Sequence, residues 1–129
     1  MSKYVVDAYA WVEYFDGTSA GGKVKEIVEN SANEIFTNVI TIAEMSSHFK
    51  RKGLDFSEAK RIILSLSVVY IIDEAFAEAV GELHALIKTE RKHMSLADVI
   101  VLFTGRKLGA KVLTGDEDFR GLKETLMIK

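Results

Sequence analysis

Short segments rich in β-branched and aromatic residues alternate along this chain with longer segments that have helical periodicity. This alternation predicts a parallel sheet, because parallel strands need helical crossovers, and those helices cover both faces. We therefore predict one domain over residues 1–129 with a three-layer α/β/α fold. Its central parallel sheet has four to five strands, at residues 3–6, 34–37, 68–72, 111–114 and, as an edge strand, 126–128.

Glycines and capping residues delimit the predicted helices, because the chain contains no proline. Gly17, Gly21 and Gly22 predict a loop, and the pair Asp55 and Glu58 predicts a capping box. The expected helices cover residues 8–15, residues 23–31, a segment ending at Lys52, a segment ending near Ser67, a segment capped by Asp73 and ending near Lys92, and a segment from Ser95 to Gly109.

Composition excludes several classes of protein. An apolar fraction of 48% is ample for a packed core and excludes disorder. No apolar run is long enough to span a membrane, and no signal peptide is recognisable, so we expect a cytoplasmic protein. Because the chain has no cysteine, any metal must be bound by oxygen or imidazole.

Four carboxylates interrupt segments that otherwise resemble buried core. They are Asp7, Glu44, Asp98 and Asp116. An isolated ionised acid in a low-dielectric interior costs several kcal/mol unless it is paired or binds a metal. Asp7 and Asp116 follow predicted strands, and ligands bind at the carboxyl edge of open parallel sheets. The pattern therefore favours one shared site for a hard divalent cation, Mg²⁺ or Mn²⁺.

Each acid also has a purely structural interpretation. Thr41 with Glu44, and Ser95 with Asp98, match the spacing of a capping box. Asp7 could cap a helix, and Asp116 could be a turn residue. For Asp98 alone the two interpretations are balanced, and for Glu44 the capping interpretation is weaker because helical periodicity begins before Thr41. Four independent coincidences are less probable than one shared site.

The order and spacing of these motifs resemble those of PIN-domain ribonucleases, the toxins of VapBC toxin–antitoxin pairs. The similarity covers essentially the whole chain and is carried by residues 4–8, 42–44, 95–101 and 113–119. It differs at Tyr9, where many members of the family have Ser or Asn. No acid of the family pattern is missing.

The resemblance implies a set of functional residues. Asp7, Glu44 and Asp98 would hold Mg²⁺ or Mn²⁺, with Asp116 as the fourth acid and Asp118 assisting. The hydroxyls of Ser95 and Thr114 would orient carboxylates. The family further implies cleavage of RNA by a metal-activated water, with the four acids as catalytic residues, a homodimer, and a small antitoxin protein as partner.

The formal net charge of −2 is unfavourable for an RNA-binding protein, because RNA is itself negatively charged. Without the five acids assigned to the site, however, fourteen acids face seventeen lysines and arginines, an excess of +3. Solvated helix ends are the simpler explanation for the basic residues, but three clusters could instead bind phosphates: Lys50, Arg51 and Lys52; Lys88, Arg91, Lys92 and His93; and Arg106, Lys107 and Lys111.

Other signals are weaker. Residues 17–24 nearly match a phosphate-binding loop, but Val24 stands where Ser or Thr is needed and no strand precedes the segment. His48 shares a helix face with Glu44, although a solvated position is favoured. Aromatic residues Trp11, Tyr14 and Phe15 fit a core better than a base-stacking surface. Two alternative functions remain open: a metal-dependent phosphatase of small phosphoesters, and a non-catalytic domain that binds a partner.

Overall fold

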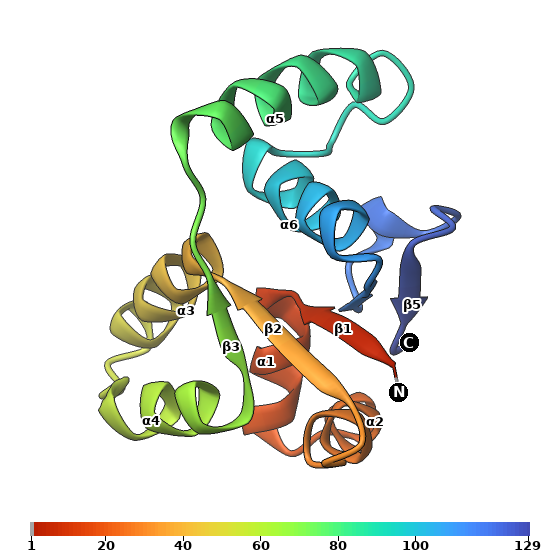
Figure 1. Ribbon diagram of the computed structural model, residues 1–129. Helices are drawn as coiled ribbons and strands as arrows, with labels where there is room; N and C mark the ends of the chain where they lie inside the picture. The colour runs from red at the N-terminus through yellow and green to blue at the C-terminus, as the bar shows by residue number, and fades with distance from the viewer. Residues whose placement is uncertain (1) are drawn as a thin grey trace.

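The computed structural model describes residues 2–129 and contains one five-stranded sheet in which all neighbouring strands are parallel. The strands lie in the order β3-β2-β1-β4-β5 (Figure 1). Their bounds are β1 (Lys3–Val6), β2 (Glu34–Asn38), β3 (Val68–Tyr70), β4 (Lys111–Thr114) and β5 (Thr125–Met127). The predicted fold class is confirmed, and the third strand ends two residues earlier than the sequence suggested.

Six α-helices connect the strands: α1 (Ala8–Asp16), α2 (Ser19–Val28), α3 (Val39–Arg51), α4 (Ser57–Leu66), α5 (Glu74–Ile87) and α6 (Leu96–Leu108). A 3₁₀ helix, η1 (Glu117–Phe119), follows β4. None of the helices within residues 2–129 has the length and hydropathy required to cross a bilayer.

The core has two halves, one on each face of the sheet. Successive residues of a strand point to opposite faces, so Val6 joins one half and Val5 the other. Helices α1 to α4 cover the Val6 face with residues such as Trp11, Val24, Met45 and Ile63. Helices α5 and α6 cover the Val5 face (Figure 1), with residues such as Phe76, Val80, Val99 and Leu102.

The second helix begins four residues earlier than predicted. Helix α2 starts at Ser19, and the Thr18 side chain caps it by accepting a hydrogen bond from the Gly21 N–H. Gly21 is therefore not a loop residue. A Cβ at this position would lie 2.0 Å from the Glu13 carbonyl oxygen, so Gly21 permits close packing of α2 on α1. Because α1 precedes residues 17–24, the phosphate-binding-loop interpretation is wrong.

Two further helix limits differ from the predictions. The capping box at Asp55 and Glu58 is absent: Asp55 Oδ1 accepts hydrogen bonds from the N–H and hydroxyl of Ser57, the first residue of α4. Asp73 caps α5 as expected by accepting from the Phe76 N–H, but the helix ends at Ile87 instead of near Lys92. Residues 88–95 form a connector to α6 instead of helix.

The topology fixes where a ligand can bind. From β1 the chain proceeds outward through β2 to β3, then returns to place β4 on the other side of β1. The strand order thus reverses between β1 and β4, and a crevice at the carboxyl ends of such a pair is the usual binding position in open α/β sheets. Asp7 directly follows β1, and Asp116 lies two residues beyond β4.

Candidate metal centre

Asp7 lies at the centre of the carboxyl edge. It is the N-cap residue of α1, yet its side chain does not cap the helix. Instead, Asp7 Oδ2 accepts a hydrogen bond of 2.8 Å from the Thr114 hydroxyl, and Thr114 Oγ1 accepts one of 3.1 Å from the Asp116 N–H. Thr114 is fully buried. It therefore orients Asp7 and holds the start of the Asp116 loop at the same time.

Glu44 comes from the second turn of α3. That helix is capped by Asn38, whose Oδ1 accepts from the Ile40 N–H at 2.8 Å, so the interpretation of Thr41 and Glu44 as a capping box is wrong. Glu44 Oε1 is buried and has no hydrogen-bond partner among residues 2–129. A buried carboxylate oxygen without a donor is costly, and a bound cation would satisfy it.

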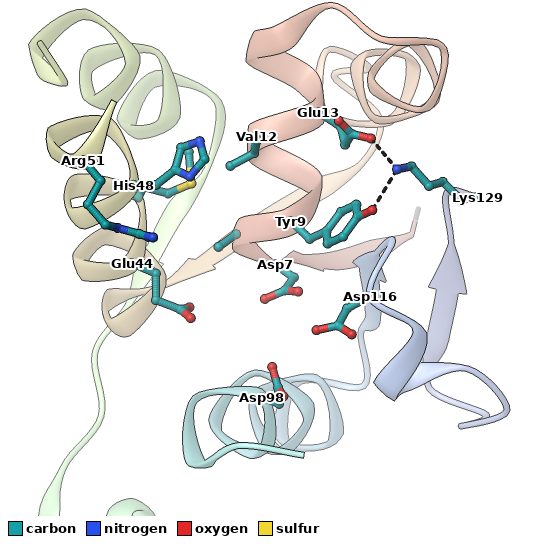
Figure 2. Close-up of a pocket in the computed structure, with 12 residues that line it drawn as sticks. Asp7, Tyr9, Val12, Glu13, Glu44, His48, Arg51, Asp98, Asp116 and Lys129 are labelled. Atoms are coloured by element: carbon teal, nitrogen blue, oxygen red, sulfur yellow. Dashed lines mark hydrogen bonds and ion pairs between the residues drawn. The ribbon is translucent and has the colours of Figure 1, made fainter. Parts of the chain in front are cut away.

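Asp98 forms the capping box that its spacing from Ser95 predicted. Its Oδ2 accepts from the Ser95 N–H at 3.0 Å, while Ser95 Oγ accepts from the Asp98 N–H at 3.1 Å. These two bonds complete a capping box at the start of α6. The same bonds fix the side chain so that the carboxylate is directed toward Asp7 and Asp116 (Figure 2).

Asp116 and Asp118 belong to the turn after β4. Asp116 Oδ1 accepts from the Asp118 N–H at 2.9 Å and caps η1, as expected for a turn residue. Carboxylate oxygens of Asp98, Asp116 and Asp118 lie within 4.8 Å of one another. An octahedral Mg²⁺ with bonds of about 2.1 Å separates opposite ligand atoms by about 4.2 Å, so this spacing is close to what one cation needs.

Asp7 and Glu44 line the same pocket as Asp98 and Asp116, but they are not members of that closest group. The family resemblance implied a centre in which Asp7, Glu44 and Asp98 hold the metal, with Asp116 as the fourth acid and Asp118 assisting. Within residues 2–129, the tightest cluster of acids is shifted toward the loop after β4. The pocket therefore collects the acids of four separate elements on one side of the molecule.

The electrostatics of the site disfavour this many charges without a cation. The pKa of Asp7 is raised to about 7, mainly by burial and also by the charges of Glu44 and Asp98, against the opposing hydrogen bond from Thr114. Burial and the charge of Asp98 raise the pKa of Glu44. The pKa of Asp98 is raised by burial and, against its hydrogen bonds with Ser95, by Asp116 and Asp118. A divalent cation would offset both the burial and the repulsion.

The pocket has a volume of about 470 Å³, and basic side chains line it as well as acids (Figure 2). Arg51 and His48 line it from α3, and Lys129 lines it from beyond β5. Lys129 Nζ donates to the Tyr9 hydroxyl at 2.7 Å and pairs with Glu13 Oε1 at 2.9 Å. Cationic groups thus border the acids, as suits a site for an anionic substrate.

Sequence reasoning missed part of this lining. Lys129 follows a weak edge strand and carries no motif, and Tyr9 was noted only as a departure from the family pattern. The Tyr9 ring lies against Gly115, where a Cβ would be 2.5 Å from Tyr9 Cε1. His48, for which a solvated position was favoured, is half-buried and lines the pocket.

The three basic clusters do not form one surface at the pocket. Arg51 of the first cluster lines it, whereas Arg91 of the second donates to backbone carbonyls of Asp118 and Arg120. Arg106 of the third cluster pairs with Glu124 at 2.8 Å. Trp11 is fully buried and donates to Thr37 Oγ1, so its assignment to the core is confirmed.

The residues of the site fit a hard divalent cation. All five acids offer oxygen ligands, and Glu44 Oε1 lacks any other partner within the described chain. The carboxylates of the closest group come from a turn and a helix end that hydrogen bonds hold in place.

Residues 4–124 match the model of the PIN domain family, and the chain belongs to that family. No curated protein sequence matches it significantly.

Solved structures of similar fold belong to toxin–antitoxin systems. The Mycobacterium tuberculosis toxin VapC20, described as cleaving the Sarcin-Ricin loop, superposes with a TM-score of 0.75 at 19% identity over 93% of this chain and 95% of that one. A toxin–antitoxin complex from Klebsiella pneumoniae gives 0.71 at 20% identity over 98% of both chains. VapBC2 of Rickettsia felis, bound to a promoter DNA fragment, gives 0.72 at 14% identity over 97% and 96%. These similarities place the chain among VapC-like PIN folds.

Proposed function

We propose that this protein is a Mg²⁺- or Mn²⁺-dependent endoribonuclease and the toxin of a toxin–antitoxin pair. Membership of the PIN family and the VapC-like fold support a nuclease. The observation that carries the metal dependence is the convergence of four acids, Asp7, Glu44, Asp98 and Asp116, on one pocket. Asp118 adds a carboxylate within 4.8 Å of those of Asp98 and Asp116, and Glu44 Oε1 is buried without a partner within residues 2–129. Acids that only cap helices would not need to share one pocket.

Asp98, Asp116 and Asp118 would form the closest ligand group, with Asp7 and Glu44 completing the cage from the other side of the pocket. When bound, the cation would lower the pKa of a water and neutralise charge on the scissile phosphate. Thr114 and the Ser95 cap keep the carboxylates of Asp7 and Asp98 in place. These contacts lower the cost of bringing like charges together before the substrate arrives.

The cationic side of the pocket supports a nucleic-acid substrate. Arg51 forms no ion pair within residues 2–129, so its guanidinium is available for a phosphate flanking the scissile one. Lys129 is held at the opposite side of the opening by Tyr9 and Glu13 (Figure 2). We propose RNA as the polymer, consistent with the family resemblance and with the Sarcin-Ricin loop cleavage described for VapC20 of M. tuberculosis.

The proposed partners are a small antitoxin protein and a second copy of the chain. The similar structures from Klebsiella pneumoniae, Rickettsia felis and Salmonella typhimurium contain a toxin with its antitoxin or a VapBC complex. A cytoplasmic location fits an enzyme whose substrate is RNA. The mass in solution, measured by light scattering, tests the homodimer: a mass of one chain at micromolar concentration contradicts it.

Cleavage of labelled RNA tests the enzymatic proposal. We expect cleavage with Mn²⁺ or Mg²⁺, none with EDTA, and at least a 100-fold loss for Asp98→Asn, an effect on the order of those for other key catalytic groups. The asparagine Oδ1 can still accept from the Ser95 N–H, so the helix cap survives. Glu26→Gln, on the exposed face of α2, is the matched control and should cleave normally. Equal cleavage by Asp98→Asn and wild type contradicts the assignment.

Two further measurements separate the alternatives. Turnover of para-nitrophenyl phosphate without RNA cleavage would indicate a phosphatase of small phosphoesters. The absence of carboxylate-dependent Mn²⁺ binding in calorimetry would indicate a non-catalytic partner-binding domain.

A further inference from the structure

Arg91 lies outside the pocket but touches the loop that carries two of its acids. The residue is half-buried in the connector between α5 and α6. Its Nη1 donates to the carbonyl of Asp118 at 3.0 Å and to the carbonyl of Arg120 at 2.9 Å. Its Nη2 lies against Gly121, where a Cβ would be 3.3 Å away and where φ is +90°. The loop backbone is thus folded around the guanidinium.

The connector is itself anchored to the core. Met94 is fully buried, its carbonyl is 3.1 Å from His84 Nε2 of α5, and its N–H donates to the Arg91 carbonyl. The Arg91 N–H donates in turn to the Ile87 carbonyl at 2.8 Å. The backbone of Arg91 is therefore held by α5 and the core, independently of the loop after β4.

The same connector ends at the cap of α6. Ser95, four residues after Arg91, holds the Asp98 carboxylate through its backbone N–H. Arg91, in the middle of the connector, holds the backbone of Asp118, while Ser95, at its end, holds the carboxylate of Asp98. One short segment thus contacts both elements that carry the three acids with oxygens within 4.8 Å of one another: the start of α6 and the turn after β4.

We infer that Arg91 is a positioning residue that sets the separation between Asp98 and the Asp116–Asp118 turn, and thereby the affinity of the site for its divalent cation. The inference rests on the proposed metal centre. Three like charges repel, and the turn after β4 would relax away from α6 without a tie. A guanidinium donating to two carbonyls provides that tie with fixed geometry, which a lysine ammonium cannot reproduce.

The test compares Arg91→Met and Arg91→Lys with wild type by Mn²⁺ calorimetry on the full chain. Loss of groups that orient metal ligands typically costs about 10–100-fold in affinity. We expect a loss of that size for Arg91→Met and a smaller one for Arg91→Lys. Arg61→Met on α4, where Arg61 pairs only with its helix neighbour Glu58, is the control and should bind Mn²⁺ like wild type.

Hydrogen exchange separates positioning from general destabilisation. Without metal, Arg91→Met should accelerate exchange in a peptide covering residues 115–122 and leave β1 and α3 protected as in wild type. Should Arg91→Met fold poorly, Arg91→Lys carries the same comparison. Mn²⁺ affinity within twofold of wild type in both variants overturns the inference, even if the loop exchanges faster.

The outcomes also distinguish this inference from the proposed function. If wild type binds no Mn²⁺ and Asp98→Asn changes nothing, the metal centre fails and the role of Arg91 fails with it. If wild type binds Mn²⁺, Asp98→Asn abolishes binding and Arg91→Met does not weaken it, the metal centre stands and only the role of Arg91 is refuted.

Discussion

The hydroxyl of Thr114 donates a 2.8 Å hydrogen bond to the carboxylate of Asp7, joining the ends of β4 and β1 across 107 residues of sequence. Both side chains are buried. The bond favours the ionised form of Asp7 and opposes the effect of burial on its pKa. One hydroxyl thereby links the geometry of the sheet to the charge of the site.

Replacing Thr114 with Val should weaken both stability and metal binding. The substitution keeps the shape but leaves Asp7 without its donor, and losing a hydrogen bond to a charged group costs about 1–3 kcal/mol. Urea unfolding with EDTA measures the stability, and Mn²⁺ calorimetry measures the affinity. Thr89→Val, at an exposed position just beyond α5, is the control. Unchanged Mn²⁺ affinity would show that the bond does not prepare the site.

The raised pKa of Asp7 predicts how the stability of the metal-free protein depends on pH. The folded-state pKa of Asp7, about 7, exceeds the ordinary aspartate pKa of 3.8, so the folded state holds the proton more tightly than the unfolded state. Stability therefore falls as pH rises from about 4 to 7 and then levels off. Asp7→Asn removes this penalty, which amounts to at most roughly 4 kcal/mol.

Urea unfolding in EDTA at pH 5 and pH 8 tests this prediction. The stability advantage of Asp7→Asn over wild type should grow between the two pH values, and saturating Mn²⁺ should reverse the order. A difference in unfolding free energy between Asp7→Asn and wild type that is the same at pH 5 and pH 8 would contradict the predicted ionisation of Asp7.

Metal binding should raise the melting temperature of wild type. A ligand present at 100 times its dissociation constant stabilises the native state by about 2.7 kcal/mol. EDTA should abolish the shift. Glu44→Gln should reduce it, because the amide supplies a weaker ligand to the position of the unpartnered Glu44 Oε1. Glu26→Gln should shift as wild type does, and equal shifts in both variants would remove Glu44 from the site.

Arg51 should contribute to RNA binding through charge alone. Arg51→Gln is expected to raise KM, leave kcat nearly unchanged, and lower the slope of log affinity against log salt by about 1. Lys60→Gln, at an exposed position of α4, is the control. A kcat that falls as much as kcat/KM would instead place Arg51 in the chemical step.

Gly21 and Gly22, adjacent in α2, offer a test of how α2 packs on α1. Gly21→Ala should destabilise the protein by more than about 2 kcal/mol, because its Cβ would lie 2.0 Å from the Glu13 carbonyl oxygen. Gly22→Ala meets open space and should stabilise the protein by about 0.5–1 kcal/mol. Thermal unfolding of both variants decides, and a stable Gly21→Ala would contradict the close contact of α1 and α2.

Local sequence determined most of the fold. The β-branched runs at residues 3–6 and 111–114 and the cap at Ser95 each form the element that they predict, because strand burial and capping depend on neighbours along the chain. The start of α2 could not be found this way. Gly21 looks like a loop residue until the contact with Glu13 is known, and that contact joins two separate helices.

For the site, the sequence determined which carboxylates are exceptional: acids within apolar segments need a partner, whatever the fold. Only the tertiary structure decided that Asp98, Asp116 and Asp118 form the group whose oxygens lie within 4.8 Å of one another, and that Arg51 and Lys129 line the same pocket as Asp98 and Asp116. The physical reason is separation along the chain. Burial and periodicity can be recognised from neighbouring residues. The spacing of oxygens from different elements instead depends on strand order, on the hydrogen bond from Thr114 to Asp7 and on the way the β4 loop folds around Arg91.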